Sequence, residues 1–125
     1  MVVVANIAQR ILDETRYTTS DVSSLTKLEY MIDNAIDTVN LRAGTSIADL
    51  AGAAESKSIT GSESEILVVK ELTVLLIRVL KDRGPHVAPT GLSPSTVLAD
   101  PQYDYYSKAI REDIKRLCGR STDRV

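Results

Sequence analysis

The sequence predicts an all-α, four-helix bundle-like domain built around one long apolar helix. Residues 62–83 are apolar on three sides when placed on a helix, and their charged side chains fall in a stripe roughly 120° wide. The segments on either side repeat apolar residues at steps of three and four, as helices that share a core do. All four prolines lie between residues 84 and 101, so we expect a long proline-rich loop over residues 84–100.

The central helix, residues 62–83, is expected to be the most buried element of the chain. Strands usually span about 3–10 residues, so a strand of this length is excluded. A membrane span is excluded because charges interrupt the apolar runs, which fall short of about 18 residues. A capping box of Ser62 with Glu65, or of Thr60 with Glu63, begins the helix, and the Gly-Pro pair that follows ends it. The charged stripe consists of Glu63, Lys70, Glu71, Arg78, Lys81 and Asp82.

Two helices are expected before the central one. The first spans residues 3–16, and the second spans residues 22–42 and ends at Gly44. Residues 45–62 are small and polar, and we expect an exposed loop with one helical turn around Ile47. The apolar stripes are Val4, Ile7, Ala8, Ile11 and Leu12 in the first helix, and Leu25, Leu28, Ile32, Ala35 and Val39 in the second.

Three carboxylates follow one another on the far side of the second helix, at Glu29, Asp33 and Asp37. Such a row is a possible site for a divalent cation, but no histidine and no loop ligand accompanies it. We therefore expect an acidic face that is either solvated or in contact with a basic neighbouring subunit.

The proline-rich segment is expected to contain no helix before Asp100. Its spaced apolar residues, Val87, Leu92, Val97 and Leu98, distinguish it from a plain linker. Prolines lower the entropy lost on binding and apolar side chains fill pockets, so we favour an extended arm laid against a partner. The alternative is an arm folded back on its own bundle.

The last helix is expected to open at Asp100-Pro101, an N-cap followed by proline, and to end at Gly119. A polar, mobile tail over residues 120–125 should follow. Basic residues at the end of the chain are either a solvated helix terminus or a docking surface for an acidic partner or DNA. The buried stripe is Tyr103, Tyr106, Ile110, Ile114 and Leu117, and the basic residues are Lys115, Arg116, Arg120 and Arg124.

The bulk properties indicate one domain over residues 1–125, without catalytic chemistry of its own. The net charge is −2, and residues 1–60 carry 5 basic and 8 acidic side chains against 6 and 4 in residues 101–125. Cys118 is the only cysteine, which excludes an internal disulfide and favours an intracellular folding compartment. The first residues lack the pattern of a signal peptide. His86, the only histidine, has no suitable partner nearby, so we expect no catalytic, metal or cofactor site.

Three stretches together resemble the small head–tail connector proteins of tailed bacteriophages, also called adaptor or head-completion proteins. The first is the acidic-faced helix L-E-Y-M-I-D-N-A-I-D-T-V-N-L-R-A-G. The second is the apolar helix I-L-V-V-K-E-L-T-V-L-L-I-R-V-L-K-D-R-G. The third is the tyrosine-containing helix Y-D-Y-Y-S-K-A-I-R-E-D-I-K-R-L, which follows a loop. The resemblance covers residues 5–118 in order and proportion.

The resemblance implies a non-enzymatic virion protein of the phage neck, assembled in the host cytoplasm and without a membrane or a cofactor. Copies would form a ring, commonly of twelve subunits, seated between the portal protein and a stopper or tail-completion protein. DNA would pass through the ring without sequence-specific binding. The residues expected at interfaces are Val87, Leu92, Val97, Leu98, Tyr103, Lys115, Arg116, Arg120, Arg124, Glu29, Asp33 and Asp37.

Two other classes compete with this interpretation. One is another small intracellular helical-bundle protein, either regulatory or from a virion. The other is an all-helical nucleotide pyrophosphatase, which would bind magnesium through Glu-x-x-Glu pairs on facing helices. Glu29 and Asp33 are four residues apart and do not match that spacing, so the sequence disfavours the enzyme.

Overall fold

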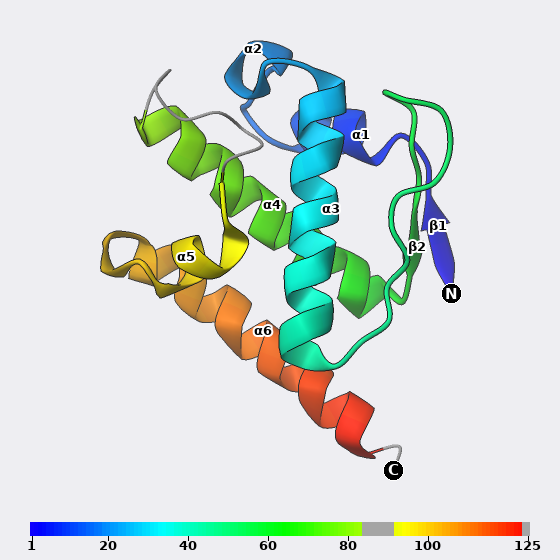
Figure 1. Cartoon of the computed structure of the whole chain (residues 1–125), viewed down its shortest axis with the longest axis vertical. Helices are drawn as coiled ribbons and strands as arrows, with labels where there is room; N and C mark the ends of the chain where they lie inside the picture. Colours follow the sequence, from blue (N-terminus) through cyan, green and yellow to red (C-terminus); the bar gives the residue numbers. More distant parts are fainter. Residues whose placement is uncertain (84–91, 124–125) are drawn as a thin grey trace.

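The computed structural model describes residues 1–83 and 92–123. They form a mostly helical domain with a small two-stranded sheet, which confirms the prediction of an all-α, bundle-like fold (Figure 1). Helices α3, α4 and α6 pack against one another, and α3 crosses in front of the other two (Figure 1). The elements are β1 (Val2–Val4), α1 (Ile7–Glu14), α2 (Thr19–Val22), α3 (Leu25–Ala43), β2 (Ile59–Gly61), α4 (Glu63–Arg83), α5 (Pro94–Ala99), a 3-10 turn (Pro101–Tyr103) and α6 (Asp104–Asp123).

The centre of the domain is α4, as the sequence predicts. Its side chains Leu72, Leu76 and Val79 are fully buried, and the helix packs against α2, α3, α5 and α6. The capping box of Ser62 and Glu65 is present. The Ser62 hydroxyl accepts the Glu65 N–H at 3.1 Å, and the Glu65 carboxylate accepts the Ser62 N–H at 2.8 Å.

The prediction of a helix from residue 3 is wrong at the start of the chain, because Val2–Val4 form the strand β1. Three consecutive β-branched residues favour extended backbone. The strand pairs antiparallel with β2, with Val2 opposite Gly61 and Val4 opposite Ile59. Helix α1 begins only at Ile7 and buries the rest of the predicted apolar stripe.

The helix predicted over residues 22–42 is α3, but it begins later, at Leu25, and the separate short helix α2 precedes it. Between them Ser23 has a φ of 74°, which lies outside the right-handed helical region and turns the chain. Ser24 then caps α3 by accepting the N–H of Lys27 at 3.1 Å. Gly44 ends α3 in the left-handed conformation, with a φ of 70°, as predicted.

The prediction that helix is absent before Asp100 is also wrong, because Pro94–Ala99 form α5. Ser93 stands directly before Pro94, and proline is favoured at the first position of a helix. The Ser93 hydroxyl caps the helix by accepting the N–H of Thr96 at 3.5 Å. The described part of the proline-rich segment is therefore structured within its own subunit.

The last helix begins at Asp104, after a 3-10 turn that Asp100 caps through the N–H of Gln102, and it continues past Gly119. A glycine costs a helix interior about 1 kcal/mol but does not by itself end the helix. Val87 and Arg124 lie outside the described residues, as does the side chain of Arg120. Among the described residues, no helix is long and apolar enough to cross a membrane.

Candidate subunit interface

The sequence predicts that the acidic row on α3 is solvated or in contact with a basic neighbouring subunit, and this is wrong for Glu29, which is buried. Its carboxylate is 2% exposed and accepts two backbone N–H groups, from Glu55 at 2.8 Å and from Lys57 at 2.9 Å. A buried carboxylate is stable only when hydrogen bonds replace its hydration, and these two bonds do so. Glu29 therefore holds the loop between α3 and β2 and is removed from the candidate interface residues.

Two further side chains of α3 continue this contact along the loop. Asp33 accepts the N–H of Leu50 at 3.0 Å, and Asn40 binds both the N–H and the carbonyl of Ile47 at 2.9 Å. The expected helical turn around Ile47 is absent, and the loop forms only an antiparallel bridge between Ala51 and Ser58 before β2. We call Glu29, Asp33 and Asn40 the loop clamp.

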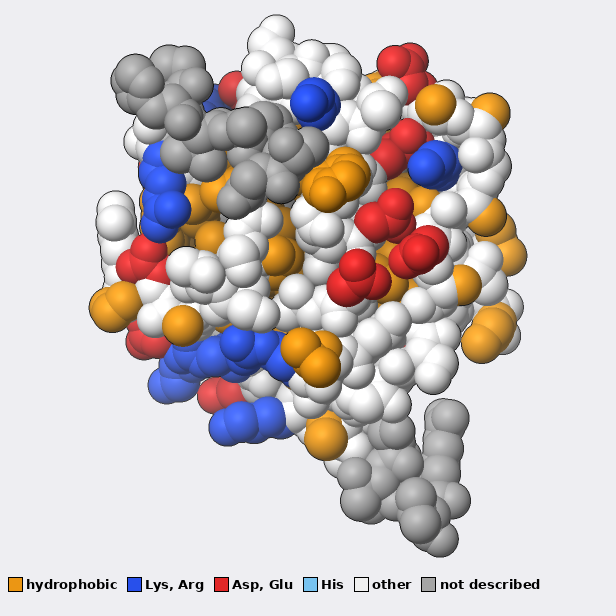
Figure 2. Space-filling view, viewed as in Figure 1, with side chains coloured by type: hydrophobic (Ala, Val, Ile, Leu, Met, Phe, Trp, Pro, Cys, Tyr) orange, Lys and Arg blue, Asp and Glu red, His pale blue; other side chains and the backbone are white. Residues whose placement is uncertain are grey.

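Asp33 and Asp37 remain at the surface with Asp49, which follows in the clamped loop. Burial raises the pKa of Asp33, the Leu50 N–H opposes that effect, and the charges of Asp49 and Asp37 add to it. Figure 2 shows acidic side chains gathered over α3 and the following loop, on the face turned to the viewer. The residues that the structure describes contain no cluster of three or more side chains able to hold a metal ion.

The other predicted interface residues that the structure describes before α6 belong to the subunit's own core. Leu92, Val97 and Leu98 are buried, and α5 packs against α3, α4 and α6. Tyr103 is also buried, and its hydroxyl donates a hydrogen bond to Asp82 at 3.2 Å. Burial raises the pKa of Tyr103, and the charge of Asp82 raises it further. The expectation that these four side chains contact a partner is therefore wrong.

Arg111 fixes α5 to α6 from the outside. Its guanidinium donates to the carbonyl of Leu98 and to the hydroxyl of Ser107, each at 2.7 Å. It also forms an ion pair with Asp104 at 2.7 Å. These bonds hold α5 against the bundle, which explains why the segment before α6 folds back rather than extending to a partner.

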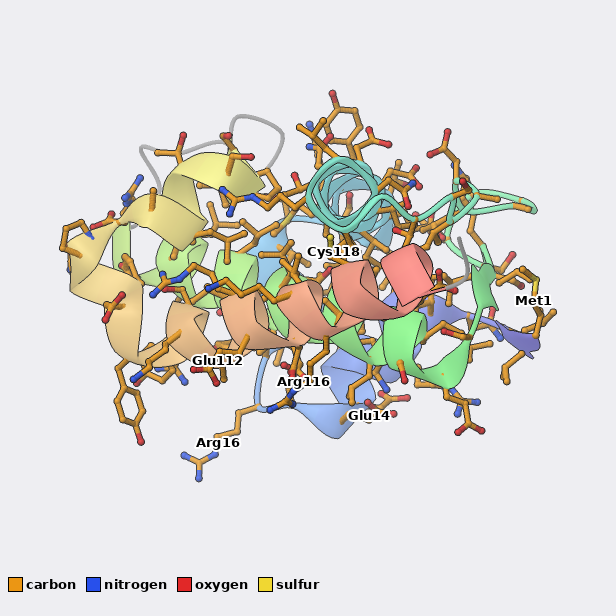
Figure 3. The ribbon with its side chains drawn as sticks, turned by 90° about the horizontal axis from the view of Figure 1, so that it is seen from below. Met1, Glu14, Arg16, Glu112, Arg116 and Cys118 are labelled. Atoms are coloured by element: carbon orange, nitrogen blue, oxygen red, sulfur yellow. The ribbon has the colours of Figure 1, made fainter. Side chains whose placement is uncertain are left out.

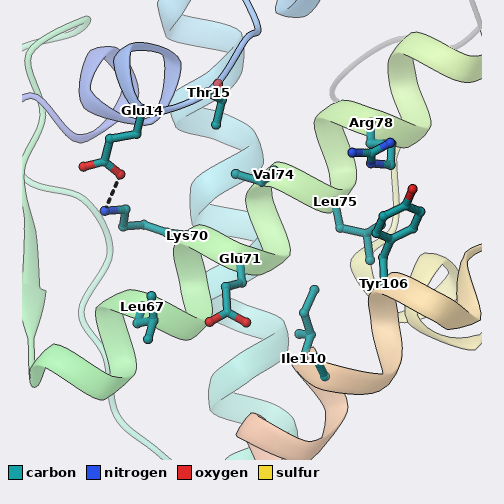
Figure 4. A pocket seen from close by; sticks show the side chains of 11 residues that line it. Glu14, Thr15, Leu67, Lys70, Glu71, Val74, Leu75, Arg78, Tyr106 and Ile110 are labelled. Atoms are coloured by element: carbon teal, nitrogen blue, oxygen red, sulfur yellow. Dashed lines mark ion pairs between the residues drawn. The ribbon is translucent and has the colours of Figure 1, made fainter.

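A groove of about 370 Å³ opens on the other side of the bundle, between α4, α6 and the end of α1 (Figure 4). In Figure 4, α3 lies behind α4, so the groove is on the face of α4 that α3 does not cover. Leu67 is 54% exposed there. The apolar lining is Leu67, Val74, Leu75, Tyr106, Ala109 and Ile110.

The two ends of the groove carry cations in different settings. At one end the Lys70 ammonium forms an ion pair with Glu14 at 2.6 Å. At the other end the Arg78 guanidinium lies 4.2 Å from the ring centroid of Tyr106, and that ring meets Tyr105 edge to face. In the described part of the chain, Arg78 has no carboxylate partner. Arginine and tyrosine are enriched where proteins contact partners.

Glu71 lines the groove between these ends and faces Asp113 of α6. Burial raises the pKa of Glu71 to about 7, and the neighbouring carboxylate of Asp113 adds to the shift through its charge and a hydrogen bond. Asp113 in turn pairs with Arg116 at 2.9 Å. Near neutral pH Glu71 is therefore partly protonated, which reduces the negative charge of the groove. Lys115 and Arg116 are exposed on α6, and their role at an interface stays a prediction.

The outer face of α3, formed by Tyr30, Asn34, Asp37 and Leu41, lies on the opposite side of the domain. Tyr30 is 51% exposed and Leu41 is 82% exposed. In Figure 3, α3 lies above the layer of α4 and α6, whereas Glu14 of the groove lies below it. The domain thus presents two faces with exposed apolar side chains, one on each side.

Sequence reasoning missed most of this candidate interface. It placed Tyr106 in the buried stripe of the last helix and named no exposed apolar residue of the central helix. The signal for Tyr30 and Leu41 was present, since both lie off the heptad-like seam of their helix. Comparison of the chain with protein-family models, with curated proteins and with solved structures found no match.

Proposed function

We propose that this chain is a structural subunit of the neck of a tailed bacteriophage. Copies of it form a ring between the portal protein and a stopper or tail component, and the ring extends the DNA channel. The resemblance of three helical stretches to head–tail connector proteins supports the proposal. The observation that carries it is the presence of two different uncovered faces, the groove and the outer face of α3, on opposite sides of the domain.

Two different faces on opposite sides favour head-to-tail association. A self-complementary dimer uses the same patch on both subunits, whereas contact between unlike patches continues from copy to copy until the rotation closes a ring. The nearly balanced charge, net −2, suits a channel wall that lets DNA slide, since strong binding to phosphates requires many cations.

The test is assembly with and without the portal. The oligomeric state is measured by light scattering and native mass spectrometry over a range of concentrations. The portal protein of the same genome is then added, and the mixture is imaged by negative-stain electron microscopy. We expect a closed ring, formed alone or on the portal, at the end of the portal that faces the tail. A chain that stays monomeric at every concentration and does not bind the portal contradicts the proposal.

A further inference from the structure

We propose that the outer face of α3 in one copy docks into the groove of the next copy, with Asp37 of the first paired to Arg78 of the second. This contact rests on the proposed ring-forming function and names the surfaces that build the ring. The occupant of the groove is thus a second copy of this chain.

The exposed apolar side chains of the described residues support this assignment. The large ones, outside the N-terminal strand and its Met1, are Tyr30 and Leu41 on the outer face of α3, Leu67 and Tyr106 in the groove, and Tyr105, whose ring contacts that of Tyr106. Each set is too exposed to be explained by the core of its own subunit. When the two sets meet, each covers the other, and burying apolar area is favourable.

The dimensions of the two faces agree. Tyr30, Asp37 and Leu41 lie at steps of seven and four along α3, and Leu67, Val74 and Arg78 lie at the same steps along α4. Both sets therefore span about 16 Å along one side of a helix. With the two sets aligned step for step, Asp37 lies opposite Val74, one helical turn or about 6 Å from Arg78, and the long arginine side chain spans that turn to reach the carboxylate. A helix laid into a groove uses such spacings for its anchors.

The charges of the two faces are complementary. Asp37 is exposed and makes no hydrogen bond or ion pair with any described residue, and its neighbours Asp33 and Asp49 are also acidic. In the groove, Lys70 is already paired with Glu14, and the raised pKa of Glu71 reduces the negative charge there near neutral pH. Arg78 is left as the cation without a carboxylate, and it stands beside the Tyr106 ring. An acidic side chain from a neighbouring copy supplies the carboxylate partner that Arg78 does not have among the described residues.

The test uses two charge reversals on opposite faces, Asp37→Arg and Arg78→Glu. Each variant alone brings like charges together at every contact, so we expect its self-association constant to fall by about tenfold or more. A mixture of the two variants restores opposite charges at every contact, provided that the two kinds of copy alternate. We therefore expect the mixture, but neither variant alone, to assemble like the unmodified chain in light-scattering measurements.

Glu55→Arg is the matched control, since Glu55 is exposed in the loop before β2 and belongs to neither face. It should assemble normally. Circular dichroism checks that each variant is folded, and rescue in the mixture checks this independently because unfolded copies cannot assemble.

The outcomes separate this contact from the proposed function. If both single variants assemble like the unmodified chain, or if both fail and the mixture fails too, Asp37 and Arg78 do not meet and the proposed contact is overturned. A ring of the unmodified chain would still support the neck function in that case. A chain that is monomeric alone and also fails to bind the portal overturns both.

Discussion

Removing the carboxylate of Glu29 is expected to destabilise the domain strongly. The side chain is 2% exposed and accepts the N–H groups of Glu55 at 2.8 Å and Lys57 at 2.9 Å. In Glu29→Ala both N–H groups lose their acceptor. A hydrogen bond to a charged group contributes about 1.5–3 kcal/mol, so two of them give a loss of about 3–6 kcal/mol in the free energy of unfolding.

Glu29→Gln removes the charge of the side chain but keeps its size and shape, so it measures how much of the lost stability is due to the charge. The amide keeps one oxygen acceptor, but its NH₂ group must face the other backbone N–H, so we expect a smaller loss of about 1–3 kcal/mol. Lys27→Gln is the control on the same helix. The Lys27 side chain is exposed and makes no hydrogen bond or ion pair with a described residue, so its change should stay within about 0.5 kcal/mol.

Urea unfolding followed by far-ultraviolet circular dichroism measures these free energies. Hydrogen exchange provides a local readout, since the amides of Glu55 and Lys57 should lose protection in Glu29→Ala even under native conditions. A loss below about 1 kcal/mol, together with unchanged protection at both amides, would refute the structural role of the loop clamp.

Two further predictions concern α5 and the groove. Val97→Ser should lower the free energy of unfolding by about 2–4 kcal/mol. Val97 is 1% exposed, and serine leaves both a cavity and a buried hydroxyl in its place. A thermal midpoint of unfolding that is unchanged within error would place α5 outside the core. Glu71→Gln should stabilise the domain at pH 8 by about 1–2 kcal/mol, a value reduced for the openness of the groove to solvent. The pKa of Glu71 is raised from 4.5 to about 7 on folding, so ionisation costs stability: the cost is absent below pH 4.5, grows between these values and is complete above pH 7. The prediction is contradicted if the difference in unfolding free energy between Glu71→Gln and the unmodified chain is the same at every pH from 4 to 8.

The parts of the fold that sequence predicted are those that local patterns determine. The apolar circumference of residues 62–83 requires burial on three sides, and the capping box of Ser62 and Glu65 forms within one turn. Gly44 ends its helix for an equally local reason, since its left-handed conformation suits glycine. Such signals do not depend on where the rest of the chain lies.

The parts that sequence did not predict depend on partners that are distant in the chain. Val2–Val4 become a strand because Ile59–Gly61 lie beside them. Glu29 becomes buried because its partners are backbone N–H groups, which no side-chain pattern marks. The helix α5 is a different case, because its start signal, Ser93 followed by Pro94, is local. The four prolines of this region led to the prediction of a loop instead.

The candidate interface was the least predictable part. Periodicity in the sequence shows which side of a helix is apolar. It does not show how α6 crosses α4, and this crossing decides whether Leu67 and Tyr106 are covered. The sequence suggested the basic residues near the end of the chain as interface candidates, because charged side chains can be counted without a structure. The groove instead combines apolar and aromatic side chains with a single unpaired cation among its described residues.

The loop clamp also determines which substitutions the loop between α3 and β2 can accept. Glu29 and Asp33 bind only main-chain N–H groups of this loop, and every residue except proline supplies such a group. The exposed side chains of the loop are thus free to change without loss of its path, whereas Ile47 and Leu50 are buried in the core. Proline at residue 47, 50, 55 or 57 removes an N–H that the clamp binds. Gly52, with a φ of 118°, is fixed by its backbone conformation. A library of single variants should therefore show wide chemical tolerance at the exposed positions of this loop and sharp exclusion of proline at these four positions.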